Sequence, residues 1–427
     1  MIFLYGVGNS LLLGGLIYMY WLRQKDVSQK KWFFPALICK LLCGILSGIF
    51  FQRYFQGGDT FLFQSQSLLL TEYFKASPAA YFKLWFTNKY ESETVRTAMI
   101  YYYYSNSYTM VFLLSFLNLI TGNLYYLNSL YFSLFSFFGA WQLVKTLGYI
   151  YPQNKYAAVV AFLFFPSVVF WSSGVMKEAV YLGALYWLFS AVLNLVFRNY
   201  RSRWLEMTGT VVAAYVLWKI RYYFAAVVFP LLFSLAVLTW AKSKYIFLKI
   251  RSYQVLLFSA CLLVFSFLVY HMEHVLRLDY FFLQLTQSYE ALVALSANRP
   301  HITYPALEPT VSSVLAHAPI AIIQTILRPL VWEGDNWFYK AAGLENVIIL
   351  LLIFGWLFSL FRYPPPRFDL LLFIFLVYII IIGTLIGLST PNLGSLNRYR
   401  VAYLPFLIYL LLQTKGYRLL VNKYFAK

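Results

Sequence analysis

The sequence has few charged residues, and acidic residues are fewer than basic ones. Asp, Glu, Lys and Arg make up 11% of the 427 residues, and 15 acids stand against 34 Lys and Arg. Soluble domains average roughly a quarter charged residues, so lipid must be the solvent for most of the surface. Hydrophobic residues reach 61% and aromatic residues 21%. The composition therefore predicts a polytopic membrane protein.

Cysteine and histidine, with three and four copies, are also scarce. Cys39, Cys43 and Cys261 all fall within apolar stretches, where a thiol ordinarily serves packing. Asp59 has no neighbouring acid, and a divalent cation needs several oxygen ligands. We therefore predict no metal site and no certain cofactor.

Long apolar stretches predict an all-α fold. A membrane-spanning helix needs about 20 apolar residues to cross roughly 30 Å of hydrocarbon. About eleven stretches are candidates: 1–22, 33–52, 124–146, 156–173, 177–197, 205–219, 222–240, 253–271, 343–361, 370–388 and 400–413. The first stretch lacks the basic residues and cleavage site of a signal peptide, so we expect a retained helix. The sequence predicts one transmembrane domain over residues 1–427.

The net charge of +19 follows the connections between these stretches. More than half of the Lys and Arg lie in alternate connections, at 23–32, 145–155, 198–203, 241–252, 362–369 and the tail from Thr414. By the positive-inside rule these connections face the cytoplasm. This places the N-terminus outside and the C-terminus inside. The charge reports topology, so we predict the lipid bilayer and no nucleic acid as a partner.

Two external loops, at about 53–122 and 271–342, are too long for turns. Each contains one apolar stretch, 108–122 or 314–332. Counting both as spanning would move strongly basic connections to the outside, so we expect surface-lying or re-entrant helices. The alternative is a pair of further spanning helices.

Ionisable residues gather at the predicted outer helix ends. They are Asp59, Lys177, Glu178, Lys219, Arg221, Arg328, Glu333, Arg398 and Arg400. Charges at such positions are costly unless used or paired, so they are functional candidates. The structural alternatives are mutual pairing, contact with lipid headgroups through long side chains, and solvation in a loop.

One prominent carboxylate among several cations suits a reaction on a lipid-linked phosphate. A carboxylate such as Asp59 can act as general base toward an incoming hydroxyl. Lys and Arg hold phosphate through charge-assisted hydrogen bonds. Preorganised cations also stabilise the charge that develops on a leaving phosphate.

The chain resembles the GT-C fold glycosyltransferases, which are polytopic enzymes that take a sugar from a polyprenyl-phosphate donor. In that superfamily the first large external loop begins with a short acidic motif and continues into a surface-lying helix. Gly58-Asp59-Thr60 is similar to the motif, and 108–122, ending before Asn123, is similar to the helix. Further similar segments are FFPSVVFWSSGVMKEA (164–179), LRPLVWE (327–333) and NLGSLNRYR (392–400). The chain departs from the pattern in placing its single acid after the second apolar stretch.

The resemblance implies a glycosyltransferase on the outer face of a bacterial inner membrane. The donor would be a polyprenyl-(di)phosphate sugar, and the acceptor a hydroxyl on a glycan, lipid or protein. Asp59 would be the general base, and the nearby cations would hold the donor phosphate. Glu178 and Glu333 are counted among the substrate-binding candidates, and Arg398 and Arg400 would contact either the phosphate or the acceptor.

Two alternatives remain open. An O-antigen or exopolysaccharide polymerase or ligase would also grip a lipid-linked phosphate with outward cations, but it can dispense with an acidic base. A lipid-linked oligosaccharide transporter would need polar groups near the membrane midplane. The sequence has few such groups, because Lys40 is the one clear charge deep in a predicted span, and this scarcity disfavours transport.

Overall fold

The computed structural model describes residues 2–24, 27–101, 105–198, 204–272, 277–363 and 369–425. Within these ranges the regular structure is helical, and the only β pairing is an isolated antiparallel bridge between His301 and Asn392. The prediction of an all-α fold is confirmed for the described residues.

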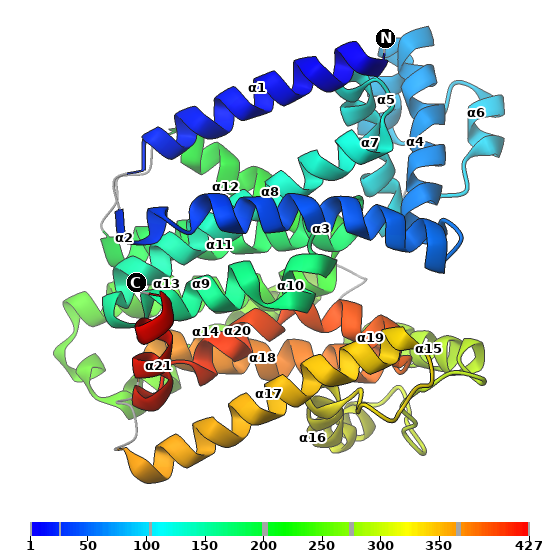
Figure 1. Cartoon of the computed structure of the whole chain (residues 1–427). Helices are drawn as coiled ribbons and strands as arrows, with labels where there is room; N and C mark the ends of the chain where they lie inside the picture. The colour runs from blue at the N-terminus through cyan, green and yellow to red at the C-terminus, as the bar shows by residue number, and fades with distance from the viewer. Residues whose placement is uncertain are drawn as a thin grey trace. The chain divides into compact units, whose positions relative to one another are not determined.

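The α-helices follow one another along the chain (Figure 1). They are α1 (Ile2–Leu22), α2 (Val27–Lys30), α3 (Phe33–Tyr54), α4 (Gly58–Ala76), α5 (Pro78–Thr87), α6 (Glu93–Ala98), α7 (Asn106–Thr121), α8 (Tyr125–Ile150), α9 (Lys155–Val159), α10 (Pro166–Trp171), α11 (Lys177–Arg198), α12 (Trp204–Ile220), α13 (Tyr222–Lys244), α14 (Arg251–Met272), α15 (Leu278–Leu295), α16 (Val311–Leu327), α17 (Trp337–Arg362), α18 (Leu370–Ser389), α19 (Leu393–Tyr399), α20 (Leu404–Leu411) and α21 (Lys415–Phe425).

Seven of the described helices are long and apolar enough to cross a membrane. They lie in α1, α3, α11, α13, α14, α17 and α18. A bent pair, α7 and α8, would make eight if it counts as one span, and its two helices meet at 115°. The predicted count of about eleven is therefore wrong for the described chain.

The missing spans have local causes. The 156–173 stretch is divided into α9, a π-helical stretch at Val160–Phe164 and α10. The division falls before Pro166, because proline lacks an N–H and clashes with the preceding turn. The 400–413 stretch begins as a 3₁₀ turn at Arg400–Ala402, which leaves only eight residues in α20.

The remaining differences concern α12 and the two predicted surface helices. α12 has 17 residues, fewer than the about 20 that a crossing requires. The 124–146 stretch, in α8, is a candidate membrane span only when it is taken together with α7, which contains the 108–122 stretch. The helix that contains most of the 314–332 stretch, α16, has 17 residues and ends at Leu327, before the stretch does. That 108–122 and 314–332 lie along the surface or re-enter stays a prediction.

Contacts divide the chain into two compact units that interleave along the sequence. Unit 1 comprises Met1–Gln142, Val169–Trp187 and Gly209–Arg221. Unit 2 comprises Leu143–Val168, Leu188–Thr208 and Tyr222–Lys427. The helices α8, α10, α11 and α12 each contribute residues to both units. Each unit is described by itself below.

In unit 1, a buried polar seam fixes α4 against α7 and α8. Asn128 Nδ2 donates to Asn118 Oδ1 at 2.7 Å and to Gln64 Oε1 at 3.1 Å. Gln64 Nε2 donates to Asn118 Oδ1 at 3.1 Å. Because buried amides are costly unless hydrogen-bonded, this mutual satisfaction specifies how the three helices pack. It thereby sets the orientation of α4, which carries Asp59.

Close backbone packing joins α8 to α11 in unit 1. A Cβ added to Gly139 would lie 2.2 Å from the carbonyl oxygen of Gly183. Small residues allow such close approach between helices in membranes. α1 and α3, by contrast, spread apart from their connection at α2 (Figure 1).

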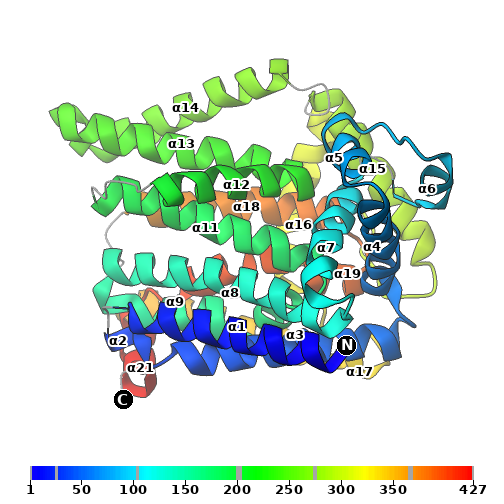
Figure 2. The same ribbon diagram turned by 90° about the horizontal axis from the view of Figure 1, so that it is seen from above.

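Unit 2 is built around α18. Its core is aromatic: Phe406 packs against Phe162, Phe189 and Phe375, with ring centroids 5.0 to 5.1 Å apart. α13 and α14 form an extended hairpin in the same unit (Figure 2).

A loop in unit 2 positions the start of α19. Ile302 N donates to Pro391 O at 2.9 Å, and Leu393 N donates to Pro300 O at 3.1 Å. This short pairing places the helix that carries Arg398.

Candidate functional site

The backbone before α4 fixes the position of Asp59. Gln56, Gly57 and Gly58 have φ values of 52°, 104° and 51°. This left-handed run turns the chain sharply between α3 and α4, and glycine adopts such φ values without a steric cost. Asp59 follows in the first turn of α4 with an exposed side chain. A carboxylate there is favoured by the positive end of the helix dipole.

Tyr101 lies within electrostatic reach of Asp59. Burial raises the pKa of the Tyr101 phenol, the charge of Asp59 raises it further, and a hydrogen bond with Ser107 lowers it. Its ring packs against Phe63, one turn after Asp59 on α4, with centroids 5.6 Å apart. With a raised pKa, Tyr101 keeps its proton at neutral pH and can serve as a hydrogen-bond donor.

Lys177 contacts the same residues. Its Nζ donates to Ser107 Oγ at 2.8 Å and lies 5.4 Å from the centroid of the Phe63 ring. Ser107 thus bonds both Tyr101 and Lys177, and Phe63 packs against both. We call Asp59, Phe63, Tyr101, Ser107 and Lys177 the Asp59 corner. It places an exposed carboxylate and an ammonium beside one aromatic pair.

Glu178 and Arg221 form a buried ion pair in unit 1. Arg221 Nη2 lies 3.3 Å from Glu178 Oε1, and the two side chains are 11% and 0% exposed. The Arg221 guanidinium also lies 5.7 Å from the centroid of the Tyr181 ring. Lys219 is half-buried near the end of α12, with Nζ 5.8 Å from the Tyr215 ring centroid. Glu178 therefore neutralises one of the predicted phosphate-binding cations.

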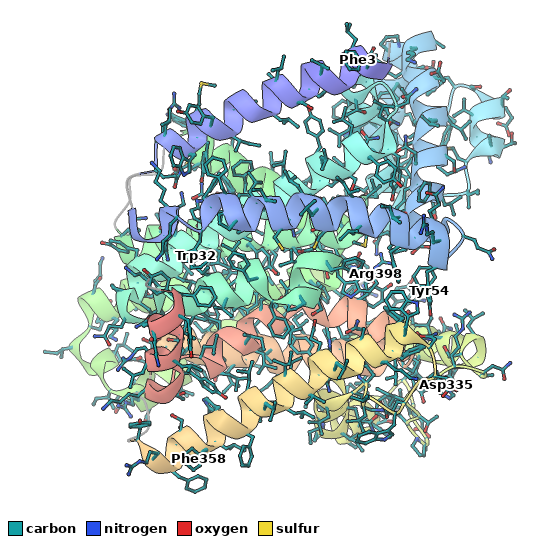
Figure 3. All side chains as sticks on the ribbon, in the orientation of Figure 1. Phe3, Trp32, Tyr54, Asp335, Phe358 and Arg398 are labelled. Carbon is teal, nitrogen blue, oxygen red and sulfur yellow. The ribbon has the colours of Figure 1, made fainter. Side chains whose placement is uncertain are left out.

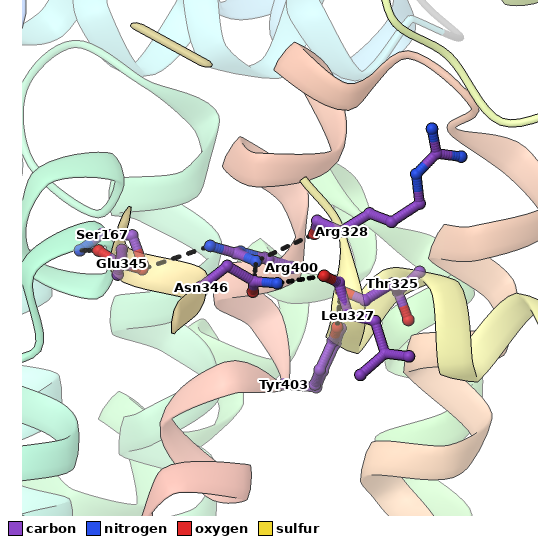
Figure 4. Close-up of polar contacts among 8 residues, drawn as sticks. All are labelled: Ser167, Thr325, Leu327, Arg328, Glu345, Asn346, Arg400 and Tyr403. Atoms are coloured by element: carbon purple, nitrogen blue, oxygen red, sulfur yellow. Dashed lines mark hydrogen bonds and ion pairs between the residues drawn. The ribbon is translucent and has the colours of Figure 1, made fainter. Parts of the chain in front are cut away.

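Arg400 lies in the interior of unit 2 and is 1% exposed (Figure 4). Its Nη1 donates to Asn346 Oδ1 at 2.8 Å and to the Arg328 carbonyl at 3.3 Å, and its Nη2 lies 3.4 Å from Glu345 Oε1. Glu345 Oε2 also accepts from Ser167 N at 2.8 Å. A buried charge requires such pairing, so this network ties α10, α16 and α17 to Arg400.

Arg328 extends away from Arg400 (Figure 4) and pairs with Glu333. Its Nε donates to Glu333 Oε1 at 2.5 Å, and Glu333 Oε2 accepts from Leu330 N at 2.7 Å. The side chains are 25% and 14% exposed. Burial raises the pKa of Tyr304, Tyr289 raises it further, and the positive charge of Arg328 lowers it. Arg328 is thus a partly exposed cation beside a neutral phenol.

Arg398 and Asp335 are also in unit 2 and are labelled in Figure 3. Arg398 is half-buried on α19, with its guanidinium 5.7 Å from the Tyr399 ring centroid, whereas Asp335 is exposed.

The predicted site residues fall into two sets. Unit 1 holds Asp59, Lys177, Glu178, Lys219 and Arg221, and unit 2 holds Arg328, Glu333, Arg398 and Arg400. Asp59 and Lys177 meet through shared neighbours, and the pairs Glu178–Arg221 and Arg328–Glu333 are in contact. That these residues bind substrate stays a prediction.

The residues of these clusters that the sequence analysis missed include Tyr101, Ser107, Glu345 and Asn346. Tyr101 and Ser107 lie in YYYYSNSY (101–108), which suggests only an interfacial aromatic belt. Glu345 and Asn346 lie in the apolar 343–361 stretch. An ionisable residue inside a predicted span is itself a signal of function or pairing, and it could have indicated Glu345.

Metal ligands do not gather in the described part of the chain, where no three His, Cys, Asp or Glu side chains form a candidate cluster. Comparison of the chain with protein-family models, curated proteins and solved structures finds no match. The site must therefore be interpreted from its own geometry.

Proposed function

We propose that the chain is a membrane glycosyltransferase of the outer face of a bacterial inner membrane. It transfers a sugar from a polyprenyl-(di)phosphate donor to a hydroxyl of a glycan, lipid or protein acceptor. The observation that carries the proposal is the Asp59 corner, where an exposed carboxylate acts electrostatically on the protonated phenol of Tyr101, which shares its neighbours Ser107 and Phe63 with Lys177. The likeness to the GT-C pattern at Gly58-Asp59-Thr60 supports the same assignment.

Within this mechanism Asp59 removes the proton of the acceptor hydroxyl. The oxygen then attacks the anomeric carbon of the donor sugar, and the bond from that carbon to the phosphate oxygen breaks. Lys177 stabilises the negative charge that develops on the leaving phosphate. Tyr101, which keeps its proton, donates a hydrogen bond to a sugar or phosphate oxygen.

The other charged residues receive roles that match their burial. Glu178 holds Arg221 in place, because a fully buried carboxylate on a guanidinium is suited to positioning. Arg400 and Glu345 organise the interior of unit 2 in the same way. Lys219, Arg328 and Arg398, which retain partial exposure, are the further cations assigned to phosphate or acceptor, with Glu333 orienting Arg328.

The test compares wild type with Asp59→Asn and Glu72→Gln in lipid vesicles. Glu72 is the matched control, since it is an exposed carboxylate on the same helix, paired with Lys75 at 2.7 Å. The substrates are lipid-linked saccharides extracted from cells that lack the protein, and mass spectrometry follows the released lipid phosphate. Loss of a general base typically lowers the rate by about 10²- to 10⁴-fold. Asp59→Asn should therefore release lipid phosphate more slowly than wild type by about this factor, and Glu72→Gln should release it at the wild-type rate.

The remaining outcomes decide between the alternatives. Release by Asp59→Asn at the wild-type rate would remove Asp59 as the base and favour the polymerase or ligase reaction. If neither wild type nor Asp59→Asn releases lipid phosphate, and the donors and acceptors are intact, transport would be favoured. One observation supports that second candidate: Lys40, 6% exposed in α3, hydrogen-bonds Ser172 and makes no ion pair with the described residues. Ionisable groups at that depth ordinarily serve function.

A further inference from the structure

His317 lies on α16 with each ring nitrogen facing a backbone carbonyl. Its Nδ1 is 2.8 Å from Ser313 O, one turn earlier on the same helix, and its Nε2 is 3.0 Å from Pro305 O, in the loop before α16. A carbonyl oxygen only accepts hydrogen bonds, so each nitrogen needs a hydrogen to bond there. A neutral imidazole carries one N–H and an imidazolium carries two. Both contacts are therefore hydrogen bonds only when His317 is protonated.

The Ser313 hydroxyl is a poorer partner for Nδ1 than the Ser313 carbonyl. Its Oγ lies 3.5 Å from Nδ1, compared with 2.8 Å for the carbonyl oxygen. The same hydroxyl accepts from Glu308 N at 2.9 Å and is placed to donate to Ala306 O at 3.4 Å. Ser313 thus joins the loop to α16 without replacing the second hydrogen of His317.

The segment that His317 holds is a turn with an uncommon backbone conformation. Ala306 has a φ of 55°, a left-handed value that few residues other than glycine adopt. It directly follows Pro305, whose carbonyl faces His317, and it comes two residues before Glu308, whose N–H reaches Ser313. We call residues 305–308 the latch turn. If His317 is neutral, one of its two carbonyls faces a nitrogen lone pair, and the turn loses one of its hydrogen bonds to α16.

The loop that contains the latch turn also holds the start of α19. Ile302 N donates to Pro391 O, and Leu393 N donates to Pro300 O. These backbone bonds do not depend on protonation. The loop is therefore fastened at two places, to the residues before α19 by bonds that are insensitive to pH and to α16 by His317.

The ionisable groups around His317 leave its charge to the two carbonyls. The Tyr304 ring faces the imidazole with centroids 6.0 Å apart, and Tyr304 is the neutral phenol described above. With the described residues His317 makes no ion pair. α15, α17 and α18 pack against α16. The exposed ionisable side chains on these helices and on the loop are Asp279, Tyr280, Glu290, Arg299, Glu308, Lys340 and Arg362. The buried and half-buried ones are Tyr289, His301, Tyr339, Glu345 and Tyr378.

We infer that His317 is a pH-sensitive latch, whose protonated ring holds the latch turn on α16 and whose neutral ring releases it. The closed turn binds one proton more than the open turn, so closure is favoured as the pH falls and lost as it rises. Histidine is the side chain that ordinarily changes charge between about pH 5 and 8. Release of the turn loosens the loop that pairs with the start of α19, the helix that carries Arg398. The inference concerns this loop and does not depend on the proposed reaction.

Hydrogen exchange of the purified full-length protein, followed by mass spectrometry, tests the latch. Protection is measured at about pH 5.5 and about pH 8, as the ratio of the exchange rate expected for an unfolded chain to the observed rate, which removes the intrinsic pH dependence of exchange. The peptide of interest covers residues 303–313, and residues 318–327 of the same helix are the internal reference. The variants are His317→Gln, which is neutral at both pH values, and His301→Gln. His301 is the matched control because its Nδ1 faces a single carbonyl, that of Arg299 at 2.8 Å, which a neutral ring can satisfy.

In wild type, protection of residues 303–313 should fall by about tenfold between the two pH values, since one coupled proton changes an opening equilibrium by up to about tenfold per pH unit. The reference peptide should not change. His317→Gln should show low protection at both pH values, and His301→Gln should behave as wild type.

Several outcomes would overturn the inference. They are equal protection of the wild-type loop at both pH values, greater protection at the higher pH, and a pH dependence that survives in His317→Gln. Loss of the pH dependence in His301→Gln would assign the proton to His301, and a change that extends to residues 318–327 would indicate general destabilisation in place of a latch. The wild-type comparison needs no substitution, so it decides the inference even if His317→Gln fails to fold.

Discussion

At the scale of single residues, two buried ion pairs of the described chain join residues that are distant in sequence. Arg400 meets Glu345, 55 positions away, and Arg221 meets Glu178, 43 positions away. The sequence indicated Asp59 as a candidate because it is a carboxylate at a predicted outer helix end. It could not predict Glu345 as the partner of Arg400, because that contact depends on how α17 packs.

Removing one member of the Arg400–Glu345 pair should strongly destabilise the protein. Glu345→Gln leaves the Arg400 guanidinium buried without a countercharge, which costs about 3 to 5 kcal/mol. The double variant Glu345→Gln/Arg400→Met removes both charges, so it should lose less free energy of unfolding than Glu345→Gln alone. Thermal unfolding of purified protein measures the difference.

The control for this prediction is Glu72→Gln, which breaks an exposed ion pair with side chains 52% and 65% exposed. Such pairs are worth about 0 to 1 kcal/mol, so its unfolding temperature should stay close to that of wild type. A Glu345→Gln variant with the unfolding temperature of wild type would contradict the interpretation that this is a buried ion pair.

At the scale of elements, long apolar helices were predictable and broken ones were not. The predicted stretches 33–52 and 177–197 correspond closely to α3 and α11. The 156–173 stretch reads as one span by hydropathy, yet it contains Pro166 and a π-helical stretch. Hydropathy averages over such breaks, which depend on local backbone geometry and tertiary contacts.

The close contact between α8 and α11 gives an element-scale prediction. Gly139→Ala would place a methyl group 2.2 Å from the Gly183 carbonyl, and such overpacking costs about 1 to 3 kcal/mol. The variant should unfold at a lower temperature than wild type. Gly8→Ala, where nothing lies within 4 Å, should match wild type or exceed it, since alanine stabilises helices. Equal stability of the two variants would contradict the close packing.

At the scale of the whole molecule, the predicted topology places residues 53–122 outside and the C-terminal helix α21 in the cytoplasm. This can be tested by Lys89→Cys and Lys423→Cys, each in a background without Cys39, Cys43 and Cys261. A membrane-impermeant maleimide should label Lys89→Cys in intact spheroplasts. It should label Lys423→Cys only after lysis, and the reverse pattern would contradict the positive-inside assignment.

The interleaving of the two units constrains the order in which the chain can mature during synthesis. Unit 1 has all of its residues once Arg221 has been made, whereas unit 2 begins at Leu143 and continues to the C-terminus. Tyr151 donates to Asp369 Oδ1 at 2.5 Å, and Arg418 donates to Gln153 at 2.6 Å. Because the N-terminal part emerges first, Tyr151 and Gln153 are synthesised more than two hundred residues before these partners. A chain stalled after Arg221 has left the ribosome would have every residue of unit 1 but would lack the partners of Tyr151 and Gln153 in unit 2. These two polar side chains would then stay exposed to quality-control proteases.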